Sequence, residues 1–304
     1  MWLANGPGGE HHCHMTTTAP SQQVAEKRRP TVPPVASRDL LLPDMLARTG
    51  RHGVPIRRRF LQTDGAGADG SRAATLAKML RGRDGSTLDA YLLIHAMASA
   101  SEPYRAAYFS SSWVRLMRFD QDAAPAAASS RWSKTATRLE KLKLIERKRV
   151  GNVQEYHLLD EAGNGDPYKR PTKLADGRWF SLPYEYWLDG WDAKLSTAEK
   201  VMLLIALDQP DGFQIPYDRF SKWYGVSEST AKRGLTGLAR RGIIDVHTDW
   251  HINGRSEFGW VEVRSYTTVG IWSKSERDAL MKTKPKRHTP IVFVPVNAEE
   301  GGIP

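Results

Sequence analysis

The feature that most constrains this chain is a run of three helical patterns and two strand patterns between residues 196 and 266. Ser196 and Glu199 form a capping-box pattern ahead of an apolar face, and Gly225 marks a tight turn before the third helix. Residues 213–215 form a short strand pattern after the first helix. The predicted helices are 196–208, 216–224 and 227–241, and the predicted strands of the hairpin are 243–247 and 258–266.

The same order of patterns occurs earlier in the chain. Leu139 and Leu238 are 99 residues apart, and the pair Leu144–Ile145 precedes Ile243–Ile244 by the same 99 residues. This offset indicates a repeated supersecondary unit. In this earlier unit the predicted helices are 86–100, 110–118 and 129–142, and the predicted strands are 144–149 and 156–159.

The rest of the chain has a composition typical of connections and tails. Residues 1–70 are rich in Pro, Gly, Ala and Arg without a sustained period and are predicted to be a disordered basic arm. The arm carries Arg48, Arg51, Arg57, Arg58 and Arg59. Two interpretations of these cations stay open, a solvated tail and an arm that follows DNA phosphates. A linker is expected over 161–178 and a basic flexible tail over 273–304.

Charge and cysteine content exclude several classes of protein. The 304 residues hold 44 Lys and Arg against 34 Asp and Glu, a formal net charge of +10 that favours a polyanionic partner. The single cysteine excludes an internal disulfide and a Cys-rich zinc site. No apolar run approaches the roughly 18 residues of a membrane helix. We expect no membrane partner, no cofactor and, without a secretory signal pattern, a cytoplasmic location.

Both units resemble winged-helix DNA-binding proteins. The segment "GVSESTAKRGLTGLARRGII" is similar to the recognition helix and first wing strand of many bacterial regulators, and "ASSRWSKTATRLEKLKLIERKRVGNVQEYHLL" resembles it less clearly. The stretch "WFSLPYEYWLDGWDAKLSTAEKVMLLIAL" also looks like part of a plasmid replication initiator. The resemblance implies an α+β, mainly α chain with tandem winged-helix domains at 71–160 and 179–272.

A recognition helix places short polar and cationic side chains against the floor of a major groove. Between Arg131 and Arg149 the sequence holds eight cations against Glu140 and Glu146, on a predicted helix and wing. Arg233 and Lys134 are the leading candidates for guanine or neighbouring phosphate contacts. The predicted DNA-binding residues are Arg131, Ser133, Lys134, Thr137, Arg138, Arg147, Lys148, Arg149, Ser227, Ser229, Thr230, Lys232, Arg233, Thr236 and Arg255.

Other motifs support an enzyme or a cofactor site poorly. Residues 65–70 match G-x-G-x-x-G, but no strand–helix–strand unit surrounds them. His11, His12, Cys13 and His14 lie in the predicted arm, and the aromatic residues around Trp187 are expected to form core rather than to stack bases. We therefore expect a non-enzymatic, sequence-specific duplex-DNA-binding protein, a transcriptional regulator first. The alternatives are a plasmid-type replication initiator, an enzyme targeted by its winged helices, and a protein-docking module. A homodimer is left open.

Overall fold

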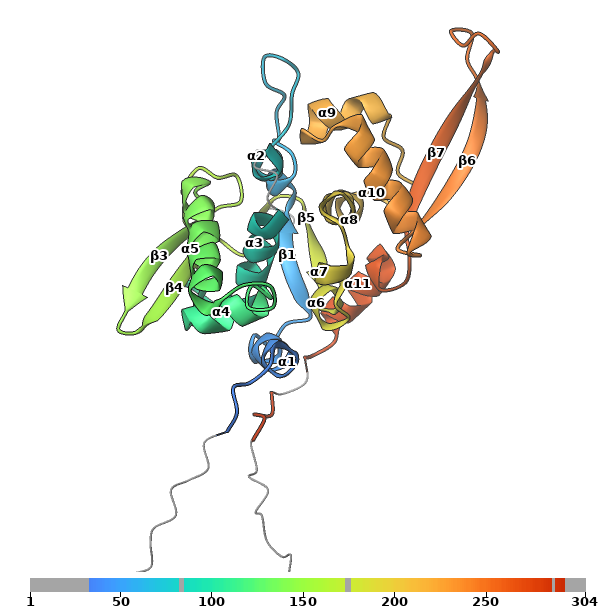
Figure 1. Ribbon diagram of the computed structural model, residues 1–304. Helices are drawn as coiled ribbons and strands as arrows, with labels where there is room; N and C mark the ends of the chain where they lie inside the picture. Colours follow the sequence, from blue (N-terminus) through green and yellow to red (C-terminus); the bar gives the residue numbers. More distant parts are fainter. Residues whose placement is uncertain (1–32, 82–84, 173–175, 286–287, 293–304) are drawn as a thin grey trace, which may run out of the picture. The chain divides into compact units, whose positions relative to one another are not determined.

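Two groups of helices, each followed by a β-hairpin, lie on either side of a central strand pair in the computed structural model (Figure 1). The structure describes residues 33–81, 85–172, 176–285 and 288–292. Its mixture of helices and strands confirms the predicted α+β class. Residues 35–292 form one compact unit. Across the described residues, no helix is long and apolar enough to span a bilayer.

The first lobe has three helices and a three-stranded antiparallel sheet in the order β2-β4-β3. Two stacked indoles form its centre: the rings of Trp113 and Trp132 are 5.1 Å apart. Trp132 Nε1 donates a hydrogen bond of 2.8 Å to the Tyr156 hydroxyl, which satisfies a buried donor. The elements are α3 (Gly85–Met97), β2 (Arg105–Tyr108), α4 (Ser110–Leu116), α5 (Pro125–Lys141), β3 (Ile145–Val150) and β4 (Val153–Leu158).

The second lobe repeats that order. Phe213 takes the place of β2, because it forms an isolated antiparallel bridge with Tyr266. The Ser196–Glu199 capping box at the start of the first helix is confirmed. The elements are α8 (Thr197–Asp208), α9 (Tyr217–Tyr224), α10 (Glu228–Arg240), β6 (Ile244–Ile252) and β7 (Trp260–Thr268).

The 99-residue offset is reproduced in the backbone. The amide of Leu144 donates to the carbonyl of Leu139 at 3.1 Å, and the amide of Ile243 donates to Leu238 at 3.0 Å. Lys143 and Gly242 sit at the intervening turn with φ of 55° and 66°, the left-handed region that ends a helix. Both helices therefore pass into their hairpins through the same turn.

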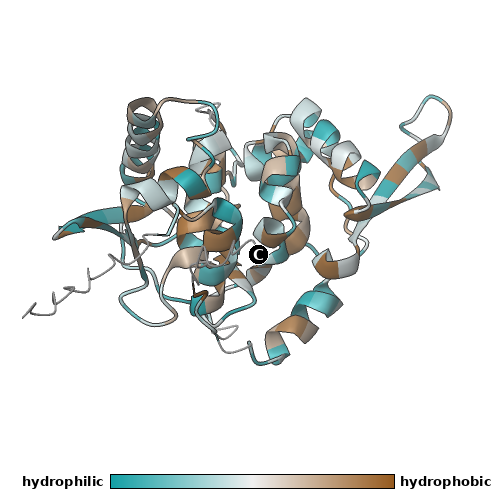
Figure 2. Cartoon of the chain, turned by 60° about the horizontal axis from the view of Figure 1, so that its bottom comes forward, coloured by the Kyte–Doolittle hydropathy of each residue, from teal (hydrophilic) through white to brown (hydrophobic). Residues whose placement is uncertain are grey.

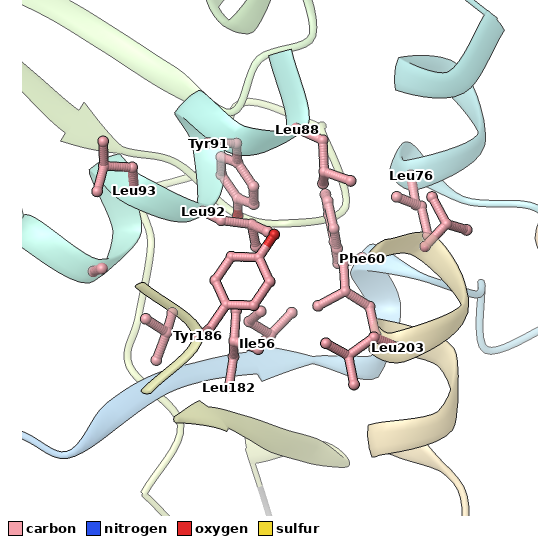
Figure 3. Close-up of a cluster of buried hydrophobic side chains, with 14 of the residues drawn as sticks. Ile56, Phe60, Leu76, Leu88, Tyr91, Leu92, Leu93, Leu182, Tyr186 and Leu203 are labelled. Carbon is pink, nitrogen blue, oxygen red and sulfur yellow. The ribbon is translucent and has the colours of Figure 1, made fainter. Parts of the chain in front are cut away.

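The central strand pair is antiparallel and consists of β1 (Gly53–Arg57) and β5 (Trp179–Pro183), with helices around it. Its core joins the two lobes: Ile56 and Leu182 from the strands meet Tyr91 of α3 and Leu203 of α8 (Figure 3). Lys200 on α8 and Asp89 on α3 add an ion pair of 2.7 Å. The remaining elements are α1 (Arg38–Arg48), η1 (Arg58–Phe60), α2 (Thr75–Arg81), α6 (Glu185–Leu188), α7 (Trp191–Lys194), η3 (Gly270–Trp272) and α11 (Lys274–Lys282).

The predicted disordered arm is wrong for its second half. From Arg38 onward the chain forms α1, β1 and η1, and all five residues of β1 are buried. Residues 1–32 lie outside the described part. Arginines in this segment support structure instead of forming a free basic patch, because a guanidinium can satisfy several carbonyl and carboxylate acceptors at once.

Each arginine of that segment has its own acceptor. Arg57 pairs with the buried Glu161 at 3.0 Å, and Arg59 pairs with Asp160 at 3.0 Å. The others make these contacts: Arg38 with Asp192, Arg48 with Asp44, Arg51 with the carbonyls of Ala96 and Ala98, and Arg58 with Gln62 and Asp208.

The linker and tail predictions also need correction. In the expected linker, Glu161 and Tyr168 are buried against the first lobe, where Tyr168 packs edge-on against His95. In the expected tail, α11 buries Arg277, which donates to carbonyls of three elements, those of Trp272, Ser181 and Leu207. Such multiple acceptors hold a cation inside a fold. The aromatic residues Phe180, Tyr184, Tyr186 and Trp187 are core, as predicted.

Two element boundaries differ in ways that matter for the surface. Helix α5 begins at Pro125 and not at Ser129, because proline fits the first turn of a helix, where its missing N–H needs no partner. Strand β6 continues to Ile252, so the second hairpin is longer than predicted.

Candidate nucleic-acid interface

The turn between α9 and α10 is tight and tolerates only glycine at its centre. Gly225 has φ of 63°, and a Cβ built on it would lie 2.5 Å from the Cβ of Ala77 on α2. Ser227 then caps α10 by accepting from the amide of Thr230 at 3.2 Å. This helix–turn–helix agrees with the predicted boundaries.

Helix α10 has one packed face and one exposed face. Ala231, Leu235 and Leu238 are buried, whereas Lys232, Arg233 and Thr236 are exposed. Among the described residues, no carboxylate forms an ion pair with Lys232 or Arg233, and neither side chain donates a hydrogen bond. A cation without an intramolecular partner keeps its full capacity for an anionic ligand.

Close packing holds α10 against α8, which the sequence analysis missed. A Cβ on Gly234 would lie 2.5 Å from the Ala198 carbonyl oxygen and 2.4 Å from Met202 Cγ. A Cβ on Gly237 would lie 2.3 Å from the Glu199 carboxylate. The G-x-x-G spacing, which puts two glycines on one helix face, was the available signal.

An open groove of about 790 Å³ runs between the start of α8 and the exposed face of α10. Lys232, Arg233 and Arg240 supply positive charge to it, while Arg241 is held by Glu199 at 2.8 Å. Short side chains at the start of α8 line one part of the groove, those of Ser196, Thr197 and Ala198, and the cations of α10 line the other.

The exposed face of α5 forms the corresponding surface of the first lobe. Ser133, Lys134 and Arg138 are exposed beside the buried Trp132 and Ala136. Arg131 stacks over the Phe119 ring at 4.3 Å, which orients its guanidinium. The Thr137 hydroxyl donates back to the Ser133 carbonyl at 2.9 Å, so its proton is already used.

The hairpin cations of the first lobe are partly engaged. Arg147 is paired with Glu140 and donates to the Thr137 hydroxyl, and Lys148 contacts Glu146 at 3.0 Å. Arg149 donates to the Gly151 carbonyl at 3.3 Å at the end of the hairpin. The two glutamates of residues 131–149, Glu140 and Glu146, are each paired with one of the eight cations. The remaining six positive charges stay on α5, β3 and the turn between them.

None of the fifteen predicted residues is buried. Ser229 is exposed beside Ser227, and its hydroxyl lies 3.2 Å from the Ser227 hydroxyl. Arg255 lies in the loop of the β6–β7 hairpin and not on α10. Residues 244–268 hold four carboxylates against the guanidiniums of Arg255 and Arg264, so this hairpin is a poor surface for phosphates.

A buried polar cluster below the first lobe was also missed. Burial raises the pKa of Glu161 to about 7 although Arg57 opposes the shift, and burial lowers the pKa of His95 well below its ordinary value. The His95 Nε2 atom lies 3.9 Å from Glu161. Both side chains are inaccessible, so the cluster supports the fold and offers no reaction site.

Comparison of the sequence with protein-family models finds no match, and comparison with curated proteins finds no relative. In the part of the chain that the structure describes, no group of three or more His, Cys, Asp or Glu side chains is arranged to hold a metal ion. His11, His12, Cys13 and His14 lie outside the described residues.

Proposed function

We propose that the two lobes are winged-helix domains and that this chain binds duplex DNA sequence-specifically, as a transcriptional regulator. The observation that carries the proposal is the exposed face of α10, the capped second helix of the helix–turn–helix, where Lys232 and Arg233 have no partner among the described residues. A helix presented this way fits a major groove, whose base edges accept hydrogen bonds from arginine and lysine.

The order of elements supports the same assignment for both lobes. Each has a helix, a strand or bridge, two helices and a hairpin, and each strand or bridge pairs with the last strand of its lobe. The third helix is exposed on one side in both, and both carry cations there. One chain therefore offers two candidate recognition helices, α5 and α10, without a partner subunit.

We further propose that the lobes differ in role. Arg233 projects from α10 without competing contacts, which suits a bidentate contact to a guanine edge. The cations of α5 and β3 are more numerous, and several are held by neighbouring glutamates or carbonyls, which suits phosphate contacts that fix the register. On this proposal α10 selects the sequence and the first lobe supplies most of the charge.

The test is selection of duplexes from a random library, followed by titration of the selected duplex and a scrambled duplex at several salt concentrations. Six to ten phosphate contacts would give a log–log slope of about −5 to −9, at roughly −0.9 per contact. The selected duplex should bind at least tenfold more tightly than the scrambled one. Equal affinity for both duplexes, or a slope near zero, would contradict the proposal.

A further inference from the structure

The β6–β7 hairpin carries an exposed apolar face that no intramolecular contact explains. It projects away from α9 and α10, and apolar positions continue along it beyond the lobe (Figures 1 and 2). Exposed fractions are 63% for Trp250, 81% for Ile252 and 50% for Trp260. Large apolar side chains gathered on one surface mark an interaction site more often than isolated ones do.

The strand register places these side chains on one face. Ile252 is opposite Trp260, and Val246 is opposite Tyr266, which is buried in the lobe. Since side chains alternate between faces, Val246, Trp250 and Ile252 lie on the same side of β6. This face continues the lobe's own core surface, and between Val246 and Ile252 it also carries Thr248 and the Glu262–Arg264 ion pair.

The outer edge of β6 is free in the described part of the chain. β7 has β6 on one edge and the Phe213 bridge on the other, whereas β6 pairs only with β7. Proteins guard such edges with charged side chains, lysine above all, or with proline. The equivalent strand of the first lobe, β3, follows this rule with Arg147, Lys148 and Arg149. β6 has no lysine, arginine or proline over its nine residues, and its carboxylates are those of Asp245 and Asp249.

We propose that the unpaired edge of β6 pairs with β6 of a second copy of this chain, which makes the protein a dimer through its second hairpin. A two-fold axis at Trp250 would place Trp250 against its own symmetry mate and Asp249 opposite His251 of the other copy. Opposite pairs of this kind stabilise antiparallel strands, and the same surface serves both copies, as a two-fold interface requires.

Charge selects this occupant over nucleic acid. The hairpin holds four carboxylates and two guanidiniums, so its formal charge is −2 in a chain of net charge +10, and a polyanion would be repelled there. An identical strand carries the same carboxylates, but the antiparallel register centred on Trp250 sets each Asp249 opposite His251 of the other copy and not opposite a second carboxylate.

The experiment is sedimentation analysis of the full chain without DNA, over about 1–100 μM. The wild type should show a concentration-dependent dimer, and Trp250→Glu with Ile252→Glu should raise the dissociation constant at least 100-fold. The matched control is Leu40→Glu, which changes an apolar residue of α1 that is 51% exposed and should leave the dimer intact. Thermal melting of each variant checks that the fold is retained.

A second measurement gives the register. With Cys13→Ser removing the native thiol, Trp250→Cys should form an intermolecular disulfide under mild oxidation, because opposed residues on antiparallel strands lie about 5.5 Å apart at Cα. A monomeric wild type at 100 μM, or a dimer that survives the double glutamate variant, would overturn the proposal. If the wild type is a monomer and the variant with both Trp250→Glu and Ile252→Glu binds DNA more weakly, the exposed face belongs to a DNA contact and the dimer proposal is wrong. Loss of DNA binding by the Arg233→Ala variant would leave the dimer unaffected.

Discussion

Arg233 has no acidic side chain against it among the described residues, whereas Arg147 pairs with Glu140 and Arg241 pairs with Glu199. Replacing Arg233 by alanine should reduce affinity for the selected duplex by about 1–3 kcal/mol and change affinity for a scrambled duplex little. The physical reason is the loss of a bidentate contact to one base, which random DNA does not offer in register. The measurement is binding of both duplexes at one fixed salt concentration.

The control for this variant is Lys274→Ala, which removes an exposed cation of α11. It should shift both duplexes alike and slightly. Replacing Arg147, Lys148 and Arg149 together should weaken both duplexes about equally and reduce the salt slope. Equal weakening of the two duplexes by Arg233→Ala would reverse the roles assigned to the lobes.

Glu161 ties the pH dependence of stability to one buried carboxyl. Its pKa of about 7 lies above the unfolded value of 4.5, so folding favours the protonated form. This group therefore contributes most at low pH, and its contribution declines as pH rises from 4.5 to 7. The unfolding free energy of the wild type minus that of Glu161→Gln should fall by about 2 kcal/mol between pH 5 and pH 8. Denaturant titrations at both pH values measure it, and a difference that rises with pH would contradict the shift.

At the scale of elements, the contact between α8 and α10 depends on glycine. Alanine at position 234 would gain helix propensity, about 1 kcal/mol, but its Cβ would meet the Ala198 carbonyl at 2.5 Å. Because that neighbour is backbone and cannot rotate away, Gly234→Ala should destabilise the chain by about 1–3 kcal/mol. Urea unfolding tests this.

The matched control is Gly254→Ala. No atom lies within 4 Å of the Cβ position at Gly254, so this variant should stay within about 0.5 kcal/mol of the wild type. A Gly234→Ala variant as stable as the control would show that the helices separate easily.

Elements with local signals could be predicted from the sequence. The caps at Ser196 and Ser227 and the periodic apolar faces of α8 and α10 lie within single turns or helices, so a short window contains the whole signal. Strand β1 could not be predicted, because its five buried residues are covered by β5, which lies far along the chain. Arg57 looked solvated for the same reason, since its partner is 104 residues away.

The candidate interface shows the same contrast between features set by a short stretch of sequence and features set by contacts between distant residues. The exposed face of α10 was predicted because periodicity alone separates it from Ala231 and Leu235. The ion pair between Arg147 and Glu140 and the acidic surroundings of Arg255 depend on hairpin geometry, so the sequence overestimated how many wing cations are available.

At the scale of the whole molecule, the first sixty residues decide whether the fold survives. Deleting residues 1–60 would remove Leu46, Val54 and Ile56 from the core and leave Glu161 without Arg57. A lost strand and a buried carboxyl group without its hydrogen-bond partner together remove several kcal/mol of stability, so the truncated chain should lose cooperative thermal melting. A chain starting at Val35, where the compact unit begins, is the matched control and should melt cooperatively. Calorimetry distinguishes the two, and a sharp transition in the shorter chain would show that β1 is dispensable.

The pairing of β1 with β5 has a consequence for the order of events during synthesis. β1 leaves the ribosome early, but its partner at residues 179–183 emerges only after the entire first lobe has been translated. Until then Ile56 and Val54 lack their cover, and the nascent lobe exposes apolar surface of the kind that chaperones bind. Closing so long a loop also slows folding, because the entropy of the intervening chain is lost before the strand contacts form.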